Sequence, residues 1–598
     1  MKTHIDRYLR KEDWRVKENS NMGYSLQGLN VYITEKCIAD YWLNEVYPAD
    51  ISRAHRDGDI YIHDTAGLSG YCTGWDLTDL LMKGFRGVRG KIEANPARHF
   101  RVALLQIVNF MFTVAGEVSG AIAFSNVDTL LAPFIREDGL TYDELKQNLQ
   151  EFLFNLNVPT RVGFQQPFTG ITLDLTVPDH LKNTPAIVGG KILDYTYGDL
   201  QDELDLFNMA FAEVLLEGDG GGRPFPFPLP TYSLTEDFDW DNPVYDKIWE
   251  VASKFGTPTF TNFINSNIKP EDVRAMCCNL KLDMNELKNR GGGLFSANPK
   301  TGSIGVVSIN LPRIGYESES PEEFFDTLAF LMWKAKESLE IKRKFIEDQT
   351  GMGLYPYSRF YLQDVKDATG GYWNNHFSTI AVLGMNDMIF NMFGESIMTD
   401  FGKDFAIDVL EYMRDVLLDL QKETGNLYNL EAAPAESASY KLALKDAKKH
   451  PEMRFYNIEV DGGTVPFYCN STHLPVANGL NLFEALAHQE PLQVLYSGGT
   501  SFHCFLGEKA PDIGSLKSLV KKIATSFRIP YFTITPTFSI CLEHGYIVGE
   551  QPLCPDCGAE TEIYSRVVGY LSPLERWNDG KTEEFAQRTN YKVDGETT

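Results

Sequence analysis

Apolar residues recur every three or four positions over several long stretches of the chain, a period typical of amphipathic helices. These stretches are residues 96–112, 141–156, 200–216, 321–345, 404–422, 482–489 and 512–526. Short runs rich in β-branched and aromatic residues lie between them, at residues 59–63, 306–309, 378–382 and 501–506. Strands that alternate with long helices predict an α/β fold.

The domain organisation is expected to be simple. We expect one large α/β body over residues 1–530 and a smaller unit over residues 531–598, because the composition becomes rich in cysteines and turn residues there. Residues 217–230 read EGDGGGRPFPFPLP, and so many glycines and prolines exclude a helix. This segment either lines a cleft or simply connects two elements.

Composition and charge exclude several classes of protein. The chain has 598 residues, and its apolar fraction of 43% is too high for a disordered protein. Its formal net charge of −27 argues against broad contact with nucleic acid, which needs a positive surface. The most apolar segment, residues 104–116, is shorter than the roughly 20 residues that span a bilayer. Without an N-terminal secretory signal, we predict a cytoplasmic protein that contacts no membrane and keeps its cysteines reduced.

Four residues of metal-binding type lie close together near the C-terminus. Cys541 and His544 form one pair, and Cys554 and Cys557 form a second pair after a gap of nine residues. Two such pairs on tight turns can close a tetrahedron of thiolates and an imidazole around zinc. Four protein ligands leave no open position, so the predicted zinc site is structural. The alternative is three reduced thiols beside an unrelated histidine.

Gly569 lies just beyond this cluster, in the segment SRVVGYL at residues 565–571. Taken alone, such a glycine marks a turn or a close approach. An RVxGY segment after a Cys-rich ribbon, however, resembles the radical-bearing loop of glycyl radical enzymes. A backbone radical is stabilised by flanking amide groups in one plane, which a Cβ would hinder. The resemblance therefore implies that Gly569 stores a radical.

Such an enzyme also needs a cysteine thiol within reach of the glycine. Residues 274–280 read RAMCCNL, so Cys277 and Cys278 are candidates, although paired cysteines in a core loop are more often plain buried thiols. Cys72 is a further candidate, and it follows the motif GDIYIHD at residues 58–64.

Several downstream motifs narrow the resemblance. The chain reads GVVSINLPR at residues 305–313, APAESAS at 433–439, NSTHLPV at 470–476 and SGGT at 497–500. With the cysteine and glycine motifs, this ordered series resembles the class III, or anaerobic, ribonucleotide reductases from about residue 20 to residue 590.

The resemblance implies both a fold and a set of roles. The implied fold is a ten-stranded α/β barrel with a finger loop threaded through its centre. Cys278 would carry the thiyl radical on that finger, and Cys277 is disfavoured because the family usually has another residue there. Gly569 would store the radical, and Cys72 would lie opposite Cys278 as the reducing thiol. The implied activity is that of an oxidoreductase that reduces ribonucleotides, by resemblance the triphosphates, to 2′-deoxyribonucleotides as DNA precursors.

Cofactors and partners follow from the same resemblance. A radical-SAM activating protein, carrying a 4Fe-4S cluster and S-adenosylmethionine, would remove hydrogen from Gly569. The thiyl radical on Cys278 would then take the 3′ hydrogen of the ribose, so that the 2′ hydroxyl can leave as water. Cys72 would deliver a hydrogen equivalent to the 2′ carbon. A homodimer and a deoxynucleotide or ATP specificity effector are also implied, and the apolar helix near residues 100–112 is either the dimer contact or a core helix.

Two loops are candidates for contacts to the phosphates or ribose of the substrate. The SGGT loop precedes a predicted strand and offers backbone donors in a nest-like turn, although an ordinary hairpin turn explains the bare pattern as well. The NST loop is its predicted companion. The candidate residues are Ser497, Gly498, Gly499, Thr500, Asn470 and Ser471.

Two departures from the family pattern change the expected regulation and reductant. Relatives that use formate are expected to carry an asparagine just before Gly-Val-Val, where this chain has Ser303 and Ile304. We therefore expect a glutaredoxin-like or thioredoxin-like protein to be the reductant in place of formate. The chain also starts too close to the barrel to hold an N-terminal ATP-cone, so we expect no on/off control by dATP through that module.

Two other functions remain open at this stage. The nearest is a glycyl radical enzyme of the pyruvate formate-lyase type, which also uses a Cys-Cys pair, although the metal cluster and Cys72 argue against it. The other is a non-catalytic zinc-ribbon binding protein on an α/β scaffold. Cys37, Cys469 and Cys504 have no predicted role in any of these functions.

Overall fold

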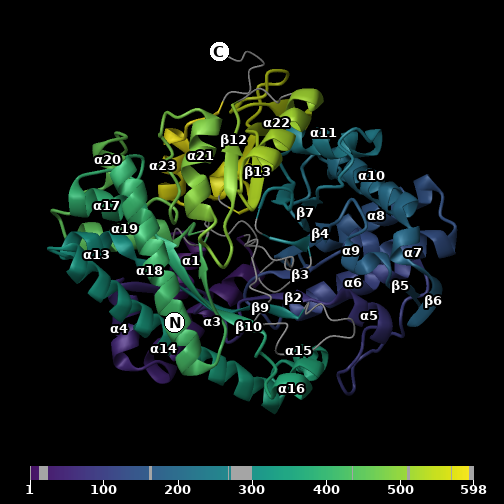
Figure 1. Ribbon diagram of the computed structural model, residues 1–598, viewed down its shortest axis with the longest axis horizontal. Helices are drawn as coiled ribbons and strands as arrows, with labels where there is room; N and C mark the ends of the chain where they lie inside the picture. Colours follow the sequence, from purple (N-terminus) through teal and green to yellow (C-terminus); the bar gives the residue numbers. More distant parts are fainter. Residues whose placement is uncertain are drawn as a thin grey trace.

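The computed structural model describes residues 2–12, 24–160, 165–266, 268–270, 300–433, 435–507, 512–567 and 569–591 (Figure 1). The segment with Cys277 and Cys278 lies outside the described residues. No helix within the described ranges is long and apolar enough to cross a membrane.

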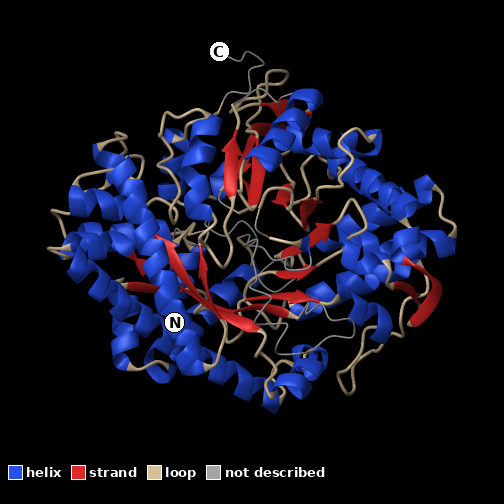
Figure 2. Cartoon of the chain, viewed as in Figure 1, coloured by secondary structure: helices blue, strands red, loops and turns tan. Residues whose placement is uncertain are grey.

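Ten strands follow one another in hydrogen-bonded order inside a layer of helices (Figure 2). In this order they are β11 (Tyr428–Glu431), β10 (His376–Leu383), β9 (Thr301–Asn310), β2 (Cys72–Trp75), β3 (Ile122–Phe124), β4 (Thr169–Leu173), β7 (Leu229–Leu234), β8 (Thr259–Asn262), β13 (Tyr531–Thr535) and β12 (Phe502–Phe505). An eleventh strand, β1 (Ile60–Ile62), pairs with β9. The predicted α/β fold with a ten-stranded sheet is confirmed.

The sheet consists of parallel groups that meet at antiparallel seams. Strands β2, β3, β4, β7 and β8 run parallel to one another. Strands β9, β10 and β11 form a second parallel group, and β12 and β13 a third. The groups meet in antiparallel pairs, β2 with β9 and β8 with β13. Parallel strands need crossover connections, which accounts for the outer layer of helices.

The ring closes between β11 and the residues just before β12. The Gly498 N–H donates to the carbonyl oxygen of Leu430 at 2.7 Å, and the Ala432 N–H donates to the carbonyl oxygen of Gly499 at 2.8 Å. A Cβ atom on Gly498 would lie 2.8 Å from the Leu430 oxygen. Glycine is therefore needed here for the close approach of two backbones.

The predicted helices are all present, with boundaries that shift by a few residues. They are α6 (Phe100–Val114), α8 (Tyr142–Asn157), α10 (Gln201–Glu217), α14 (Pro321–Met352), α18 (Asp400–Thr424), α21 (Leu482–Gln493) and α22 (Ile513–Ser526). Most side chains of α6 are buried, which fits its interpretation as a core helix. The capping box of Thr141 and Glu144 begins α8, and Gly353, at φ +91°, ends α14.

Further helices belong to the outer layer (Figure 1). They are α1 (Lys2–Leu9), α3 (Leu26–Tyr41), α4 (Ala49–Asp57), α5 (Leu77–Lys83), α7 (Val127–Asp138), α9 (Asp179–Lys182), α11 (Asp246–Lys254), α13 (Leu311–Glu317), α15 (Pro356–Tyr361), α16 (Gln363–Thr369), α17 (Met385–Phe393), α19 (Ala438–Lys449) and α20 (Tyr456–Glu459). A small hairpin, β5 (Pro185–Val188) with β6 (Lys191–Thr196), lies apart from the ring.

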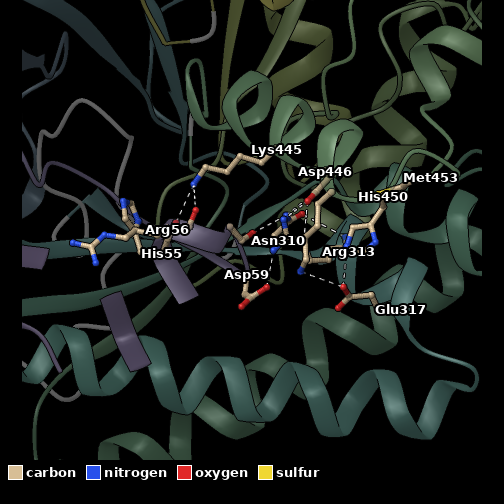
Figure 3. A network of polar contacts seen from close by, with 12 residues as sticks. His55, Arg56, Asp59, Asn310, Arg313, Glu317, Lys445, Asp446, His450 and Met453 are labelled. Atoms are coloured by element: carbon tan, nitrogen blue, oxygen red, sulfur yellow. Dashed lines mark hydrogen bonds and ion pairs between the residues drawn. The ribbon is translucent and has the colours of Figure 1, made fainter. Parts of the chain in front are cut away.

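A buried ionic network fixes α19 against the end of β9 (Figure 3). Asp446 on α19 is fully buried and pairs with the guanidinium group of Arg313. The Asn310 side chain donates to Asp446 at 2.8 Å, and the Tyr468 hydroxyl donates to it at 2.7 Å. Burial opposes the charge on Arg313, but Asp446 and Asp59 more than offset this and raise its pKa. The carboxylate therefore has partners from two other segments of the chain, one at Asn310 and Arg313 and one at Tyr468.

The C-terminal part forms a second, small sheet. Its strands are β14 (Phe538–Cys541), β15 (Gly545–Val548), β16 (Glu562–Arg566) and β17 (Leu571–Pro573), in the order β15-β14-β16-β17. Helix α23 (Asp579–Gln587) follows. Strand β13, which begins directly after the predicted domain boundary at residue 530, is part of the large ring.

Candidate active site and metal centre

The four predicted metal ligands converge on one point. Their ligand atoms all lie within 4.8 Å of one another. The Sγ atoms of Cys541 and Cys557 are 3.7 Å apart, and Nδ1 of His544 lies 3.7 Å from Sγ of Cys541 and 3.6 Å from Sγ of Cys554. Tetrahedral zinc with Zn–S bonds of about 2.3 Å places its ligand atoms about 3.6–3.8 Å apart. The residues therefore fit a tetrahedral metal site.

Local turns explain how these ligands converge. Cys541 ends β14 and pairs with Gly545, the first residue of β15, so His544 lies in the tight turn between the two strands. Gly545 and Gly558, at φ +76° and +71°, follow the second ligand of each pair. Backbone N–H groups of Glu543 and His544 lower the pKa of the Cys541 thiol to about 6, which favours the thiolate that binds metal.

The hairpin of β14 and β15, which carries Cys541 and His544, and the hairpin of β16 and β17, which carries Gly569, belong to one sheet. Strand β14 pairs with β16, with Phe538 opposite Tyr564, and their rings stack at a centroid distance of 5.4 Å. Strand β16 then pairs with β17, and Gly569 lies in the loop between these two strands. A metal ion that cross-links β14 and β15 would therefore also stabilise the base of the Gly569 loop.

The Arg566 side chain connects the Gly569 loop to the residues before β8. Its Nη1 donates to the carbonyl oxygen of Gly569 at 2.8 Å, and its Nη2 donates to the carbonyl oxygen of Gly256 at 2.6 Å. Within the loop, the Val567 N–H donates to the carbonyl oxygen of Tyr570 at 3.1 Å. Burial lowers the pKa of Arg566 to about 10, and it remains a cation at neutral pH.

Within the described part of the chain, neither the backbone conformation of Gly569 nor its packing requires a glycine. Its φ lies outside the left-handed region, and a Cβ atom built on it would have no described atom within 4 Å. Most structurally required glycines satisfy one of these two conditions. The geometry of the described residues would therefore accept an alanine here, as it would at Gly220, Gly351 and Gly507, and it is compatible with a chemical reason for glycine.

Cys72 lies on the wall of the ring, on β2, directly opposite Ser303 of β9. Its thiol is buried and accepts a hydrogen bond from the Ala121 N–H at 3.3 Å. Burial lowers the pKa of Lys342, a buried lysine on α14, while Asp64 and Cys72 act in the opposite direction. The position at which the chain departs from the formate-type pattern is thus the cross-strand neighbour of Cys72.

An aromatic residue links Cys72 to the Gly569 loop. Phe168 packs against the cluster of Cys72, Ala121, Phe377 and Leu427. The same ring makes an edge contact with Tyr570, the residue after Gly569, at a centroid distance of 5.7 Å. Phe168 therefore packs both against the cluster that contains Cys72 and against the residue that follows Gly569. Phe168 gave no signal in the sequence, because its role depends on contacts between distant segments.

The two predicted substrate loops lie side by side. The imidazole Nε2 of His473 lies 2.9 Å from the carbonyl oxygen of Ser501, and Thr472 Oγ1 lies 3.0 Å from the hydroxyl of Tyr496. Ser471 has a positive φ of 44° and donates through Oγ to the carbonyl oxygen of Val382. The two loops therefore form one surface.

Three of the SGGT residues bond to β11 and close the ring, whereas Thr500 does not. Ser497 Oγ accepts from the Leu430 N–H at 3.0 Å, and Gly498 and Gly499 make the closing bonds to β11. Thr500 is buried, and its Oγ1 has no hydrogen-bond partner among the described residues. Part of the SGGT pattern is thus explained by the fold, and Thr500 keeps an unused polar group.

A cavity of about 530 Å³ flanks the Gly569 loop. It is lined on one side by Tyr570 and Leu571 and on the other by the glycine- and proline-rich segment at residues 219–229. The guanidinium group of Arg223 bridges the two sides through paired hydrogen bonds of 2.8 and 3.0 Å to the Glu562 carboxylate. The interpretation that this segment lines a cleft is confirmed.

The cysteines without a predicted role separate into two kinds. Cys37 is exposed, whereas Cys469 and Cys504 are buried. Burial raises the pKa of both buried thiols, which makes them poor nucleophiles. They are best explained as small core residues.

Comparisons with known proteins agree on one family. A family model described as anaerobic ribonucleoside-triphosphate reductase matches residues 18–591. An anaerobic ribonucleoside-triphosphate reductase of Haemophilus influenzae is 25% identical over 92% of this chain and 80% of its own length. That of Enterobacteria phage T4 is 22% identical over 93% of both chains.

Solved structures give the same fold. The anaerobic ribonucleotide reductase of Thermotoga maritima, in complex with dATP and CTP, covers 98% of this chain and of its own chain, with a TM-score of 0.74 and 22% identity.

Proposed function

Because this chain belongs to the family of anaerobic ribonucleoside-triphosphate reductases, whose model matches residues 18–591, we propose that it reduces ribonucleoside triphosphates to 2′-deoxyribonucleotides. The names of the relatives favour this activity over that of a pyruvate formate-lyase type of enzyme. A non-catalytic zinc-ribbon protein is disfavoured for the same reason. The activity would supply precursors for DNA synthesis.

The observation that carries the residue assignment is the environment of Gly569. Nothing in its φ or its described surroundings demands glycine, whereas a planar backbone radical does. The loop is anchored by Arg566 and by the metal-binding sheet, which would keep the radical in one place. We assign radical storage to Gly569 on these grounds.

The reaction then needs two thiols inside the barrel. In our proposal the radical passes from Gly569 to Cys278, whose thiyl group takes the 3′ hydrogen of the ribose. Loss of the 2′ hydroxyl as water follows, and Cys72 delivers one hydrogen equivalent to the 2′ carbon. The external dithiol then returns this hydrogen to Cys72 and supplies the second equivalent, so that it ends as a disulfide. Return of the 3′ hydrogen restores Cys278 and then Gly569. Both thiols must be held within a fraction of an ångström, because misplacement by about 1 Å costs around 100-fold in rate.

The two electrons come from outside the barrel in this proposal. A dithiol protein of the glutaredoxin or thioredoxin type is oxidised to its disulfide, while ribonucleotide becomes deoxyribonucleotide and water. Ser303 supports this choice of reductant. It is the cross-strand partner of Cys72, and its hydroxyl donates to the carbonyl oxygen of Gly305 at 3.1 Å. A serine there offers no side-chain amide to hold formate.

Several partners belong to the same proposal. A radical-SAM protein with a 4Fe-4S cluster and S-adenosylmethionine would generate the radical on Gly569. Zinc bound by Cys541, His544, Cys554 and Cys557 would cross-link the sheet that carries the loop. Asn470, Ser471 and the residues of the SGGT loop would contact the substrate. A homodimer, a deoxynucleotide or ATP effector and a cytoplasmic location complete the proposal, and the bound dATP and CTP of the Thermotoga maritima enzyme support the effector and the substrate class.

The test is paramagnetic resonance after anaerobic activation, combined with an assay for deoxynucleotide. Wild type should give a doublet, because one α hydrogen remains on the radical carbon, and Gly569→Ala should give none. No described atom lies within 4 Å of the added methyl carbon, so the described residues give no reason for Gly569→Ala to misfold. A doublet that survives in Gly569→Ala would refute the assignment. A doublet without any deoxynucleotide product would refute the proposed reaction.

A further inference from the structure

A row of buried charges runs along α23 and beyond its end. Lys581, Glu584 and Arg588 are three and four positions apart, so they share one face of the helix. Their side chains are only 1%, 4% and 2% exposed. Charged groups at this spacing usually face solvent, and burying them is costly unless every group has a partner. The row therefore needs an explanation beyond solubility.

One end of the row reaches the predicted substrate loop. Lys581 Nζ donates to Oδ1 of Asn470 at 3.2 Å and pairs with the Glu584 carboxylate. The backbone that follows α23 is held between the end of the NSTHLPV segment and strand β12. The Thr589 N–H donates to the carbonyl oxygen of Val476 at 2.6 Å, and the Tyr591 N–H donates to that of Phe505 at 2.7 Å. This segment is therefore fixed close to the two predicted substrate loops, at residues that follow each of them.

The other end of the row reaches the Gly569 loop. Glu584 pairs with Arg588 at 3.4 Å, and Arg588 Nη1 donates to the carbonyl oxygen of Arg566 at 3.3 Å. The Arg566 side chain in turn donates to the carbonyl oxygen of Gly569 at 2.8 Å. A continuous series of polar contacts thus runs from Asn470 to Gly569.

The charges along this series do not balance. Lys581, Arg588 and Arg566 carry three positive charges against the single carboxylate of Glu584. The other contacts of the Arg566 side chain, at Thr535, Gly256 and Thr257, are also to neutral oxygens. An anionic ligand near Asn470 would meet the cationic end of the row and strengthen it. A cavity of about 80 Å³ bordered by Asn470, Val567 and Arg588 leaves room for small shifts at this junction.

We propose that Lys581, Glu584, Arg588 and Arg566 are positioning residues that couple binding of the anionic substrate at the Asn470 loop to the seating of the Gly569 loop. This inference rests on the proposed function, since it assumes a radical on Gly569 and a nucleotide at Asn470. Bound substrate would strengthen the contacts that run from Asn470 through Lys581, Glu584 and Arg588 to Arg566. The Arg566 side chain holds the carbonyl group of Gly569. The radical would then be best placed for transfer only when substrate is bound.

The experiment measures how CTP changes the exposure of the radical to hydrogen exchange. Activated enzyme is transferred anaerobically to D₂O, and collapse of the doublet to a singlet reports replacement of the α hydrogen by deuterium through a nearby thiol. In wild type we expect CTP to change this rate by about fivefold or more, the lower range of typical coupling between sites. In Lys581→Met the ratio should fall to about one, because the substitution removes the hydrogen bond that joins Asn470 to the row.

Lys581→Met is suited to this test because it leaves the Glu584–Arg588 pair and the Arg566 contact intact. Lys581→Arg should restore most of the response, since it returns a cation of sufficient length. Arg588→Lys tests the other end, because it keeps the charge but shortens the reach to the Arg566 carbonyl oxygen, and it should also lose the response. The matched control is Lys336→Met, which removes a lysine paired at 2.9 Å with Glu423 on the outer helices and should respond like wild type.

The outcomes separate this inference from the proposed function. A wild-type protein that forms no doublet would refute the proposed function. A wild-type doublet that CTP leaves unchanged, or a Lys581→Met response equal to that of wild type, would overturn the coupling alone. A merely structural role of Lys581 would lower stability but leave the CTP response of the folded enzyme intact, and that result would also count against the proposal.

Discussion

Substitution of Gly120 by alanine should displace the sulfur of Cys72 and reveal its role. A Cβ atom on Gly120 would lie 2.6 Å from Sγ of Cys72 and 3.0 Å from the carbonyl oxygen of Tyr71. Non-bonded atoms of this size prefer separations of about 3.5–4.0 Å, so the sulfur must move by about 1 Å. Overpacking of this kind costs about 1–3 kcal/mol of stability. A displacement of about 1 Å in a reacting group costs around 100-fold in rate.

The assay compares two quantities in Gly120→Ala after anaerobic activation. The amount of glycyl radical should match that of wild type, because Gly569 is loaded by the activating protein without Cys72. Deoxynucleotide formation should fall by around 100-fold. The control is Gly315→Ala, in which the new Cβ would lie 2.7 Å from the carbonyl oxygen of Met388, and which should lose stability but keep activity per folded molecule. If Gly120→Ala folds and still turns over at the wild-type rate, Cys72 is not the reducing thiol.

Three further predictions concern stability and metal. Asp446→Ala leaves Arg313 buried without its main counterion, so we expect a loss of about 3–5 kcal/mol in the free energy of unfolding, measured by chemical denaturation. Substitution of the exposed Asp400 by alanine should change the free energy of unfolding little. Equal losses in the two variants would contradict a stabilising role of the Asp446–Arg313 pair. Burial raises the pKa of Asp387 to about 7, above the unfolded value of about 4, so the folded state binds a proton more tightly and its stability falls as pH rises from about 4 to 7. Asp387→Asn should flatten this part of the profile of melting temperature against pH, and an unchanged slope would rule out Asp387 as its source. Cys554→Ser should reduce bound zinc from about one ion per chain to near none by elemental analysis and shorten the lifetime of the radical, whereas a full complement of zinc would contradict its role as a ligand.

The features that could be predicted from the sequence are those with a local cause. The long helices follow from a period of three to four residues, and boundaries such as Ser320 and Gly353 of α14 from local capping. The metal ligands could be predicted because Cys541 and His544, and Cys554 and Cys557, are each close in sequence. Tight turns bring such pairs together without help from the rest of the fold.

The features that could not be predicted depend on contacts between distant segments. Ser303 departs from a family pattern in the sequence, but its position opposite Cys72 arises only when β2 and β9 pair. Gly498 fits a phosphate-binding turn in the sequence, whereas in the structure it also closes the ring against Leu430. Lys581, Glu584 and Arg588 have the spacing of a solvated helix face, and only the packing of α23 shows that they are buried.

The order in which the ring closes has a consequence for the synthesis of the protein. Strands β2, β3, β4, β7 and β8 can pair with one another as the first half of the chain leaves the ribosome. The seam between β2 and β9 joins residues roughly 230 positions apart, and that between β8 and β13 joins residues roughly 270 positions apart, separations that make pairing slow. The ring is complete only after Thr535 has been translated, close to the end of the chain. A truncated or stalled chain would therefore expose an open sheet edge to aggregation and quality control, and it would not assemble an enclosed chamber in which a radical could persist.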